Sequence, residues 1–145
     1  MRIGVDVGGT KIEAAALHAD GRFALRRRTA TPSHDYKATL QTIVGLIEDM
    51  ESELGRQCSL GFGVPGTLSP ATGNIKNAPN APIDGHPFDR DLEALLGRPI
   101  RMMNDANCFA LSEASDGAAQ GAGIVFGVIL GTGCGGGVVI DGAVL

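Results

Sequence analysis

The sequence predicts an α/β domain, and two patterns in it predict that class. Short apolar runs bounded by glycine turns, such as residues 3–7 and 124–130, are typical of strands. Between such runs, residues 36–54 carry apolar side chains at alternating spacings of four and three. That spacing is typical of one face of a helix.

Elements of both kinds follow one another along the whole chain. In order, we expect strands at 3–7, 12–17 and 22–29, a helix at 36–54, a strand at 60–64, a helix at 88–96, a strand at 100–103, a helix from there to about 116, and strands at 124–130 and 138–140. Ser33 or Asp35 can cap the first helix, and Gly55 ends it. Residues 66–87 are rich in Pro, Gly, Asn and Ser, which predicts a long ordered loop with a small hairpin at Thr72-Gly73.

Composition and charge exclude several classes of function. A net charge of −4 and 4% aromatic residues provide neither the basic footprint nor the stacking surface of a nucleic-acid-binding protein. The separated cysteines Cys58, Cys108 and Cys134 encode neither a disulfide framework nor a zinc site. No apolar run approaches the roughly 18 residues of a membrane span. The 145 residues therefore predict one cytoplasmic domain without nucleic-acid or membrane partners.

The turn between the first two strands, with the sequence DVGGTK, is a candidate phosphate site. Gly8 and Gly9 expose backbone N–H groups with no side chain in the way, and such a concavity binds phosphate oxygens. Asp6, expected on the buried side of its strand, is placed to hold a hydrated Mg²⁺, while Thr10 and Lys11 can reach phosphate oxygens. The alternative is an ordinary hairpin turn with a solvated lysine.

A second glycine-rich turn, at residues 131–137, repeats this pattern near the end of the chain. Thr132 and the N–H groups of residues 131–137 are candidates to hold the β- and γ-phosphates of a nucleotide. The run is not a P-loop, because a strand rather than a helix follows it. Coincidence is the alternative, because hairpins are common.

Two polar segments complete the candidate site. Asn104-Asp105 follows a strand and precedes a helix, so these residues either cap the helix or place a carboxylate where α/β sheets bind ligands. Such a carboxylate can take a proton from an alcohol that attacks a phosphoryl group. In the long loop, Asn74, Asn77 and Asn80 offer amide groups to sugar hydroxyls, or are simply solvated.

Four motifs occur together: DxGGTK at 6–11, GxGxPG at 61–66, NDAN at 104–107 and GTGxGGG at 131–137. As a set, they resemble the N-terminal part of ROK-family sugar kinases over essentially the whole chain. Residues 76–78, 85–92 and 132–135 look most like bacterial manno(fructo)kinases. The segment at 104–114 is shared with bacterial N-acetylglucosamine kinases.

The resemblance implies an actin-like, ribonuclease-H-like ATPase domain with a mixed sheet, covering 1–145. It implies transfer of the ATP γ-phosphate to the C6 hydroxyl of a hexose, with Mg²⁺, in an enzyme that is a homodimer. Asp105 matches the general base and Asn104 a sugar-binding neighbour. The matches to the sugar loop are Gly66, Asn77 and Asn80. The matches to the two phosphate loops are Asp6, Gly8, Gly9, Thr10, Gly131, Thr132 and Gly133.

The resemblance also leaves alternatives open. Fructose is the expected acceptor, with N-acetylglucosamine kinase or glucokinase as alternatives and a sugar-sensing ROK regulator as a different class. The regulators carry a helix-turn-helix before the first strand, and Met1 directly precedes that strand here. The second lobe of the family, with its sugar motif, zinc site and most of the adenine pocket, is not encoded in these residues. We therefore expect them to be inactive alone.

Overall fold

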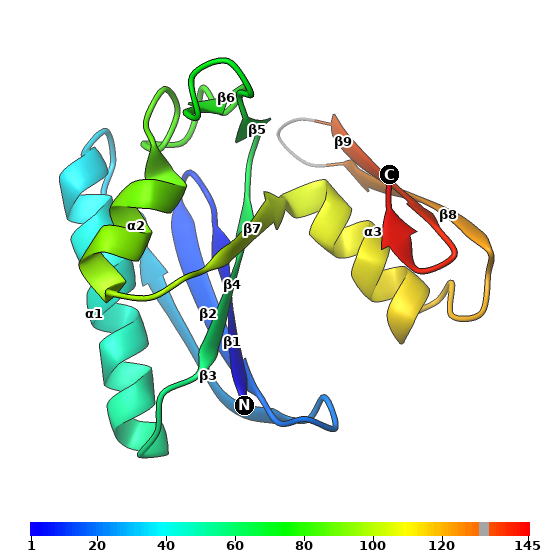
Figure 1. The fold of residues 1–145 in the computed structure, drawn as a ribbon, viewed down its shortest axis with the longest axis horizontal. Helices are drawn as coiled ribbons and strands as arrows, with labels where there is room; N and C mark the ends of the chain where they lie inside the picture. Colours follow the sequence, from blue (N-terminus) through cyan, green and yellow to red (C-terminus); the bar gives the residue numbers. More distant parts are fainter. Residues whose placement is uncertain (131–133) are drawn as a thin grey trace. The chain divides into compact units, whose positions relative to one another are not determined.

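The computed structural model describes residues 1–130 and 134–145, and the chain divides into two compact units, Met1–Met102 and Met103–Leu145 (Figure 1). Length alone predicts one domain. In chain order the elements are β1 (Arg2–Val7), β2 (Lys11–Leu17), β3 (Phe23–Ala30), α1 (Tyr36–Leu54), β4 (Ser59–Val64), β5 (Thr67–Leu68), β6 (Ile75–Lys76), α2 (Phe88–Leu96), β7 (Arg101–Asn104), α3 (Asp105–Ser115), β8 (Ile124–Leu130), β9 (Cys134–Ile140) and β10 (Ala143–Val144). The predicted order of elements is confirmed, with β5 and β6 as the hairpin in the long loop.

A five-stranded sheet, in the order β3-β2-β1-β4-β7, organises the first unit. β1 is antiparallel to β2 and parallel to β4, so the sheet is mixed, as the family resemblance implies. α1 and α2 lie along the same face of this sheet (Figure 1). Their apolar side chains join those of β1, β2 and β4 in one buried cluster.

Helix α1 begins and ends where the sequence predicts. Asp35 is its N-cap and accepts a hydrogen bond from the N–H of Ala38 at 2.9 Å, which satisfies one of the donors that a helix start leaves unpaired. Gly55 ends the helix in the left-handed conformation, with φ of 65°. The buried stripe consists of Thr39, Leu40, Ile43, Ile47 and Met50. Burial of this stripe against the sheet, rather than helix propensity, stabilises most of α1.

Asp6 was expected on the buried side of β1, and this expectation is wrong. Ile3, Val5 and Val7 are buried, while Asp6 is exposed. Successive side chains of a strand point to opposite faces, so a carboxylate between two inward residues must face outward. Asp6 therefore lies on the face of the sheet opposite α1.

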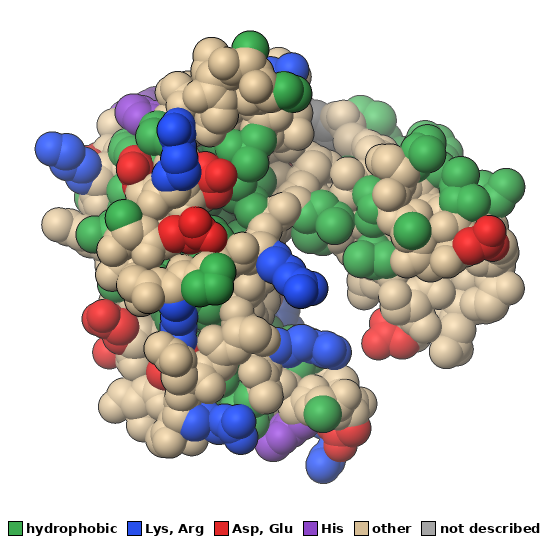
Figure 2. All heavy atoms as spheres, in the orientation of Figure 1, with side chains coloured by type: hydrophobic (Ala, Val, Ile, Leu, Met, Phe, Trp, Pro, Cys, Tyr) green, Lys and Arg blue, Asp and Glu red, His purple; other side chains and the backbone are tan. Residues whose placement is uncertain are grey.

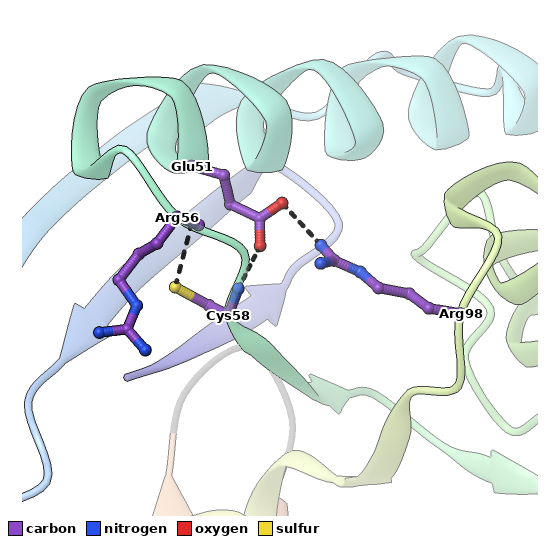
Figure 3. A network of polar contacts seen from close by, with 4 residues as sticks. All are labelled: Glu51, Arg56, Cys58 and Arg98. Carbon is purple, nitrogen blue, oxygen red and sulfur yellow. Dashed lines mark hydrogen bonds and ion pairs between the residues drawn. The ribbon is translucent and has the colours of Figure 1, made fainter.

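A polar network ties the C-terminal part of α1 to the start of β4 and to the segment before β7 (Figure 3). Glu51 accepts the N–H of Cys58 at 2.6 Å and pairs with Arg98 at 2.9 Å. The side chains of Glu51 and Arg98 are 15% and 14% exposed. The Sγ of Cys58 lies 3.9 Å from the Arg56 carbonyl oxygen.

The second unit packs α3 against the three-stranded sheet β10-β9-β8. Gly127 of β8 and Gly137 of β9 are register partners beneath the helix. A Cβ on Gly137 would lie 2.7 Å from the Ala106 carbonyl oxygen, and one on Gly127 would lie 2.8 Å from the Ala110 Cβ. These two glycines let the helix backbone approach the sheet closely.

The other face of β8 carries exposed apolar side chains. These are Ile124, Phe126, Val128 and Leu130. Figure 2 shows apolar side chains gathered over the second unit. No helix in the described part of the chain is long and apolar enough to cross a membrane.

Candidate active site

The turn between β1 and β2 is a tight backbone hairpin. The N–H of Gly8 donates to the Lys11 carbonyl oxygen at 2.9 Å, so this amide serves the turn itself. Within the described ranges, the N–H groups of Gly9 and Thr10 have no hydrogen-bond acceptor. Thr10 is exposed and Gly9 is partly exposed. This turn can therefore offer two backbone donors to an anion.

Thr31, at the end of β3, contacts this turn, and sequence reasoning missed it. Its hydroxyl donates to the Gly8 carbonyl oxygen at 2.7 Å, and its N–H donates to the Thr10 carbonyl oxygen at 3.1 Å. The residue is 7% exposed. A threonine after a strand rich in exposed residues carries no signal that it serves a turn more than 20 residues earlier in the chain.

The long loop approaches the same turn through its backbone. A Cβ on Gly9 would overlap the carbonyl oxygen of Asn80, so only glycine permits this approach. Gly66 has φ of 73°, and a Cβ there would overlap the Lys76 carbonyl oxygen. The structure thus brings the Gly8-Gly9 turn next to Asn80. It also brings Gly66 next to the backbone around Asn77.

The three loop asparagines differ in their surroundings. Asn74 donates its amide to the Gly85 carbonyl oxygen at 2.8 Å, so it holds the loop together. Asn77 and Asn80 are exposed, and Asn77 has φ of 64°. A left-handed residue other than glycine costs free energy, and such residues gather at ligand-binding sites. Of the three loop asparagines, Asn77 and Asn80 are therefore the two with exposed side chains that can bind a ligand.

An aromatic contact anchors the end of the loop. The ring of His86 stacks on Tyr36, with centroids 3.8 Å apart, and the Tyr36 hydroxyl donates to Asp91 at 2.6 Å. Burial, and then the hydrogen bond to Asp91, raise the pKa of the Tyr36 hydroxyl. This contact joins the loop to both α1 and α2.

Charges gather beside the turn on the face opposite α1. Asp6 is the register partner of Glu13, so two carboxylates lie across from each other. Arg26 pairs with Glu13 and, chiefly through this hydrogen bond, lowers the pKa of that carboxyl. Asp6 is the carboxylate nearest the turn in sequence. A single carboxylate suits Mg²⁺, which keeps several waters and takes its other ligands from substrate phosphates.

The start of α3, in the second unit, carries a separate set of candidate residues. The Oδ1 of Asn104 accepts the N–H groups of Ala106 and Asn107 at 3.1 and 3.3 Å, so Asn104 is the N-cap. Asp105 is the first helical residue, and its Oδ1 accepts the Ala106 N–H at 2.7 Å. Because Asn104 caps the helix, the carboxylate of Asp105 is not required for capping.

The second glycine-rich turn is shorter than the sequence predicts. β9 starts at Cys134, so residues 134–137 belong to a strand paired with β8 and not to a phosphate-binding turn. The physical reason is the close packing of α3, which requires glycine at position 137. The predicted phosphate ligands Gly131, Thr132 and Gly133 lie outside the described residues. Within the described ranges, no group of three or more His, Cys, Asp or Glu residues could hold a metal ion.

The sequence is similar to that of curated sugar kinases. It is 45% identical over 144 residues to N-acetyl-D-glucosamine kinase from Photobacterium profundum, a match covering 99% of this chain and 48% of that protein. The corresponding enzyme from Vibrio cholerae is 42% identical, with the same coverage. The chain spans about half the length of the curated relatives it matches.

Solved structures share its fold. A ROK hexokinase from Thermus thermophilus superposes with a TM-score of 0.87 at 37% identity, over 99% of this chain and 48% of that one. A ROK-family glucokinase from Streptomyces griseus, solved with glucose and AMPPNP, gives 0.86 at 32% identity, over 99% and 46%. The fold is therefore that of the actin-like ATPase sugar kinases. With residues 2–145 matching the ROK family, this chain belongs to that family.

Proposed function

We propose that the protein transfers the γ-phosphate of ATP to the C6 hydroxyl of a hexose. The observation that carries this proposal is the carboxylate of Asp105 at the junction of β7 and α3. Asn104, directly before it, caps the helix, so the carboxylate of Asp105 is not needed as the cap. A carboxylate at the end of a strand is placed to orient an attacking alcohol. Membership of a family that includes sugar kinases supports the same reaction.

In the proposed reaction, Asp105 accepts the proton of the sugar hydroxyl as its oxygen attacks the γ-phosphorus. The bond from that phosphorus to the bridging oxygen breaks, and ADP leaves. Little covalent chemistry falls to the protein in such a transfer, so its residues act mainly by positioning and by neutralising charge. Asn104 is a proposed sugar contact beside the base.

The first turn is the proposed phosphate site. The N–H of Gly8 already donates to Lys11 within the hairpin, so Gly9 and Thr10 would supply the N–H donors. The side chain of Lys11 would supply a positive charge. Asp6 would hold Mg²⁺ through water, and the ion would neutralise phosphate charge. Residues 131–133 remain proposed ligands of the same phosphates, on the motif alone.

The long loop is the proposed sugar site, through Gly66, Asn77 and Asn80. The comparisons do not support fructose, which the motif resemblance predicts. Curated relatives are named N-acetyl-D-glucosamine kinase, and one solved relative holds glucose. We therefore place N-acetylglucosamine first among the acceptors, glucose second and fructose third.

The test measures ADP release by the full product of the gene with each of these sugars and MgATP. Sugar-dependent release is expected, with the highest kcat/KM for N-acetylglucosamine. A higher kcat/KM for fructose would reverse the ranking. Residues 1–145 assayed alone are expected to show no turnover, because they match only about half of the related kinases and would hold the substrates from one side. Positioning of the substrates supplies up to roughly 7–11 kcal/mol of such rate enhancements.

The Asp105→Asn variant tests the role of the base. Asparagine keeps the shape and can accept the Ala106 N–H, but it cannot take a proton at neutral pH, so kcat should fall by about 10²-fold or more. Asp116→Asn, at the C-terminal end of the same helix, is the matched control and should leave kcat unchanged. Near-wild-type kcat in Asp105→Asn would refute the assignment. Sugar binding without turnover in the wild type would favour a sensor.

A further inference from the structure

Thr31 links the end of β3 to the proposed phosphate turn by two hydrogen bonds. Its side chain holds the Gly8 carbonyl at 2.7 Å, and its backbone N–H holds the Thr10 carbonyl at 3.1 Å. These two carbonyls belong to the residues on either side of Gly9. Thr31 and Thr39 are the two buried polar residues in the described part of the chain.

Because a peptide unit is planar, a hydrogen bond to the Gly8 carbonyl also fixes the direction of the Gly9 N–H. In a trans peptide, the carbonyl and the following N–H point in opposite directions. A bond from Thr31 to the Gly8 carbonyl therefore directs the N–H of Gly9 away from Thr31. That N–H has no acceptor among the described residues, so it is presented outward.

The turn needs such an anchor because it begins with two successive glycines, Gly8 and Gly9. Glycine populates many backbone conformations, so two in succession leave the direction of the N–H groups poorly fixed. The remaining restraints are the bond from Gly8 to Lys11 and the backbone of Asn80, which lies against Gly9. Neither of these holds the Gly8 carbonyl.

We propose that Thr31 is a positioning residue, which orders the turn so that the N–H of Gly9 meets a phosphate oxygen of the nucleotide. This role rests on the proposed function, because it assumes that the turn binds phosphate. Thr31 itself touches no reacting atom. Its hydroxyl should therefore affect the binding of MgATP rather than the transfer of the phosphoryl group.

The kinetic test compares Thr31→Val with Thr31→Ser in the full gene product. Valine keeps the shape and the backbone bond but lacks the hydroxyl, so the KM for MgATP should rise about three- to tenfold, while kcat and the sugar KM change less than about twofold. Serine keeps the hydroxyl and should restore the KM to within about twofold.

Thr39→Val is the matched control. Thr39 is also buried and its hydroxyl donates to the Asp35 carbonyl at 2.7 Å, but it lies in the first turn of α1. It should lower stability without changing the KM for MgATP. An unchanged KM in Thr31→Val, or an equal rise in Thr39→Val, would overturn the proposal.

Amide hydrogen exchange provides a readout that needs no activity. In Thr31→Val without nucleotide, the backbone N–H at position 31 should exchange faster than in the wild type, because the turn whose Thr10 carbonyl accepts it is loosened. In the wild type, MgATP should slow exchange at Thr31 and shift the Gly9 amide resonance. These wild-type measurements test the proposal even if the valine variant does not fold. A Gly9 amide resonance that MgATP does not shift would contradict the proposed positioning role of Thr31. A wild type that binds MgATP but transfers no phosphate would refute the proposed function and leave the positioning role standing.

Discussion

The carboxylate of Glu51 serves two partners at once. One oxygen accepts the Cys58 N–H and the other pairs with Arg98. Two nitrogens of Arg98, Nε and Nη1, are buried with no hydrogen-bond partner among the described residues. The guanidinium therefore loses hydration that its single partner only partly replaces.

This asymmetry predicts that substitutions of Glu51 and of Arg98 lower the free energy of unfolding by different amounts. Glu51→Gln leaves the buried charge of Arg98 without a counter-charge, so the free energy of unfolding should fall by about 3 kcal/mol. Arg98→Met also leaves the Glu51 carboxylate without a counter-charge, but that carboxylate keeps the Cys58 N–H and the unpaired nitrogens are removed, so the loss should be smaller, about 1–2 kcal/mol. Urea unfolding of both variants measures the difference. Equal losses would mean that the unpaired nitrogens of Arg98 are not costly.

Sequence reasoning at this scale succeeds where a residue acts on its near neighbours. A strand followed by Asn104-Asp105 and a helix predicts a cap, and Asn104 supplies it. The role of Thr31 depends on Gly8, which adjoins it only after three strands have paired. The prediction that Asp6 lies on the buried side of β1 was wrong. Its apolar neighbours suggested burial, but the alternation of side chains along the strand places it on the exposed face.

At the scale of elements, the register pair Gly127 and Gly137 determines how α3 meets its sheet. A Cβ at position 137 would lie 2.7 Å from the backbone oxygen of Ala106, in the first turn of the helix. That turn contains Asp105 and is capped by Asn104. The packing of α3 against its sheet therefore also determines where the proposed base, Asp105, lies.

The Gly137→Ala variant tests this connection. The helix backbone must shift to accept the methyl group, and overpacking of this kind should lower the free energy of unfolding by about 1–3 kcal/mol. In the kinase assay, kcat should fall with it. Gly136→Ala is the matched control: its Cβ would face the exposed ring of Phe126, which can move, so stability should change by less than about 0.5 kcal/mol. Equal effects at 136 and 137 would contradict the role of close packing.

The order of elements could be predicted because each has a local signal. The four-and-three spacing predicts α1 with its actual ends, and α2 begins and ends as predicted. The start of β9 could not be predicted, because four residues rich in glycine indicate a turn unless the facing helix is known. β10, with two residues, is too short for a periodic pattern.

At the scale of the whole molecule, β8 differs from a strand that is buried on both faces. Its continuous apolar sequence is typical of such a strand. Alternate residues nevertheless remain exposed, Phe126 at 68% and Leu130 at 80%. β8 is also an edge strand of its three-stranded sheet. Contiguous apolar surface on an edge strand favours association with other molecules.

We therefore expect residues 1–145 on their own to associate as concentration rises. Phe126→Lys places a charge in the centre of the apolar face of β8, where it should disfavour both burial and strand pairing, so the weight-average mass should fall toward that of the monomer. Phe23→Lys is the matched control, because Phe23 is 66% exposed but lies on β3, outside this face. Light scattering across a dilution series measures both. A monomeric wild type, or an equal response to the two substitutions, would show that the apolar face of β8 does not drive association.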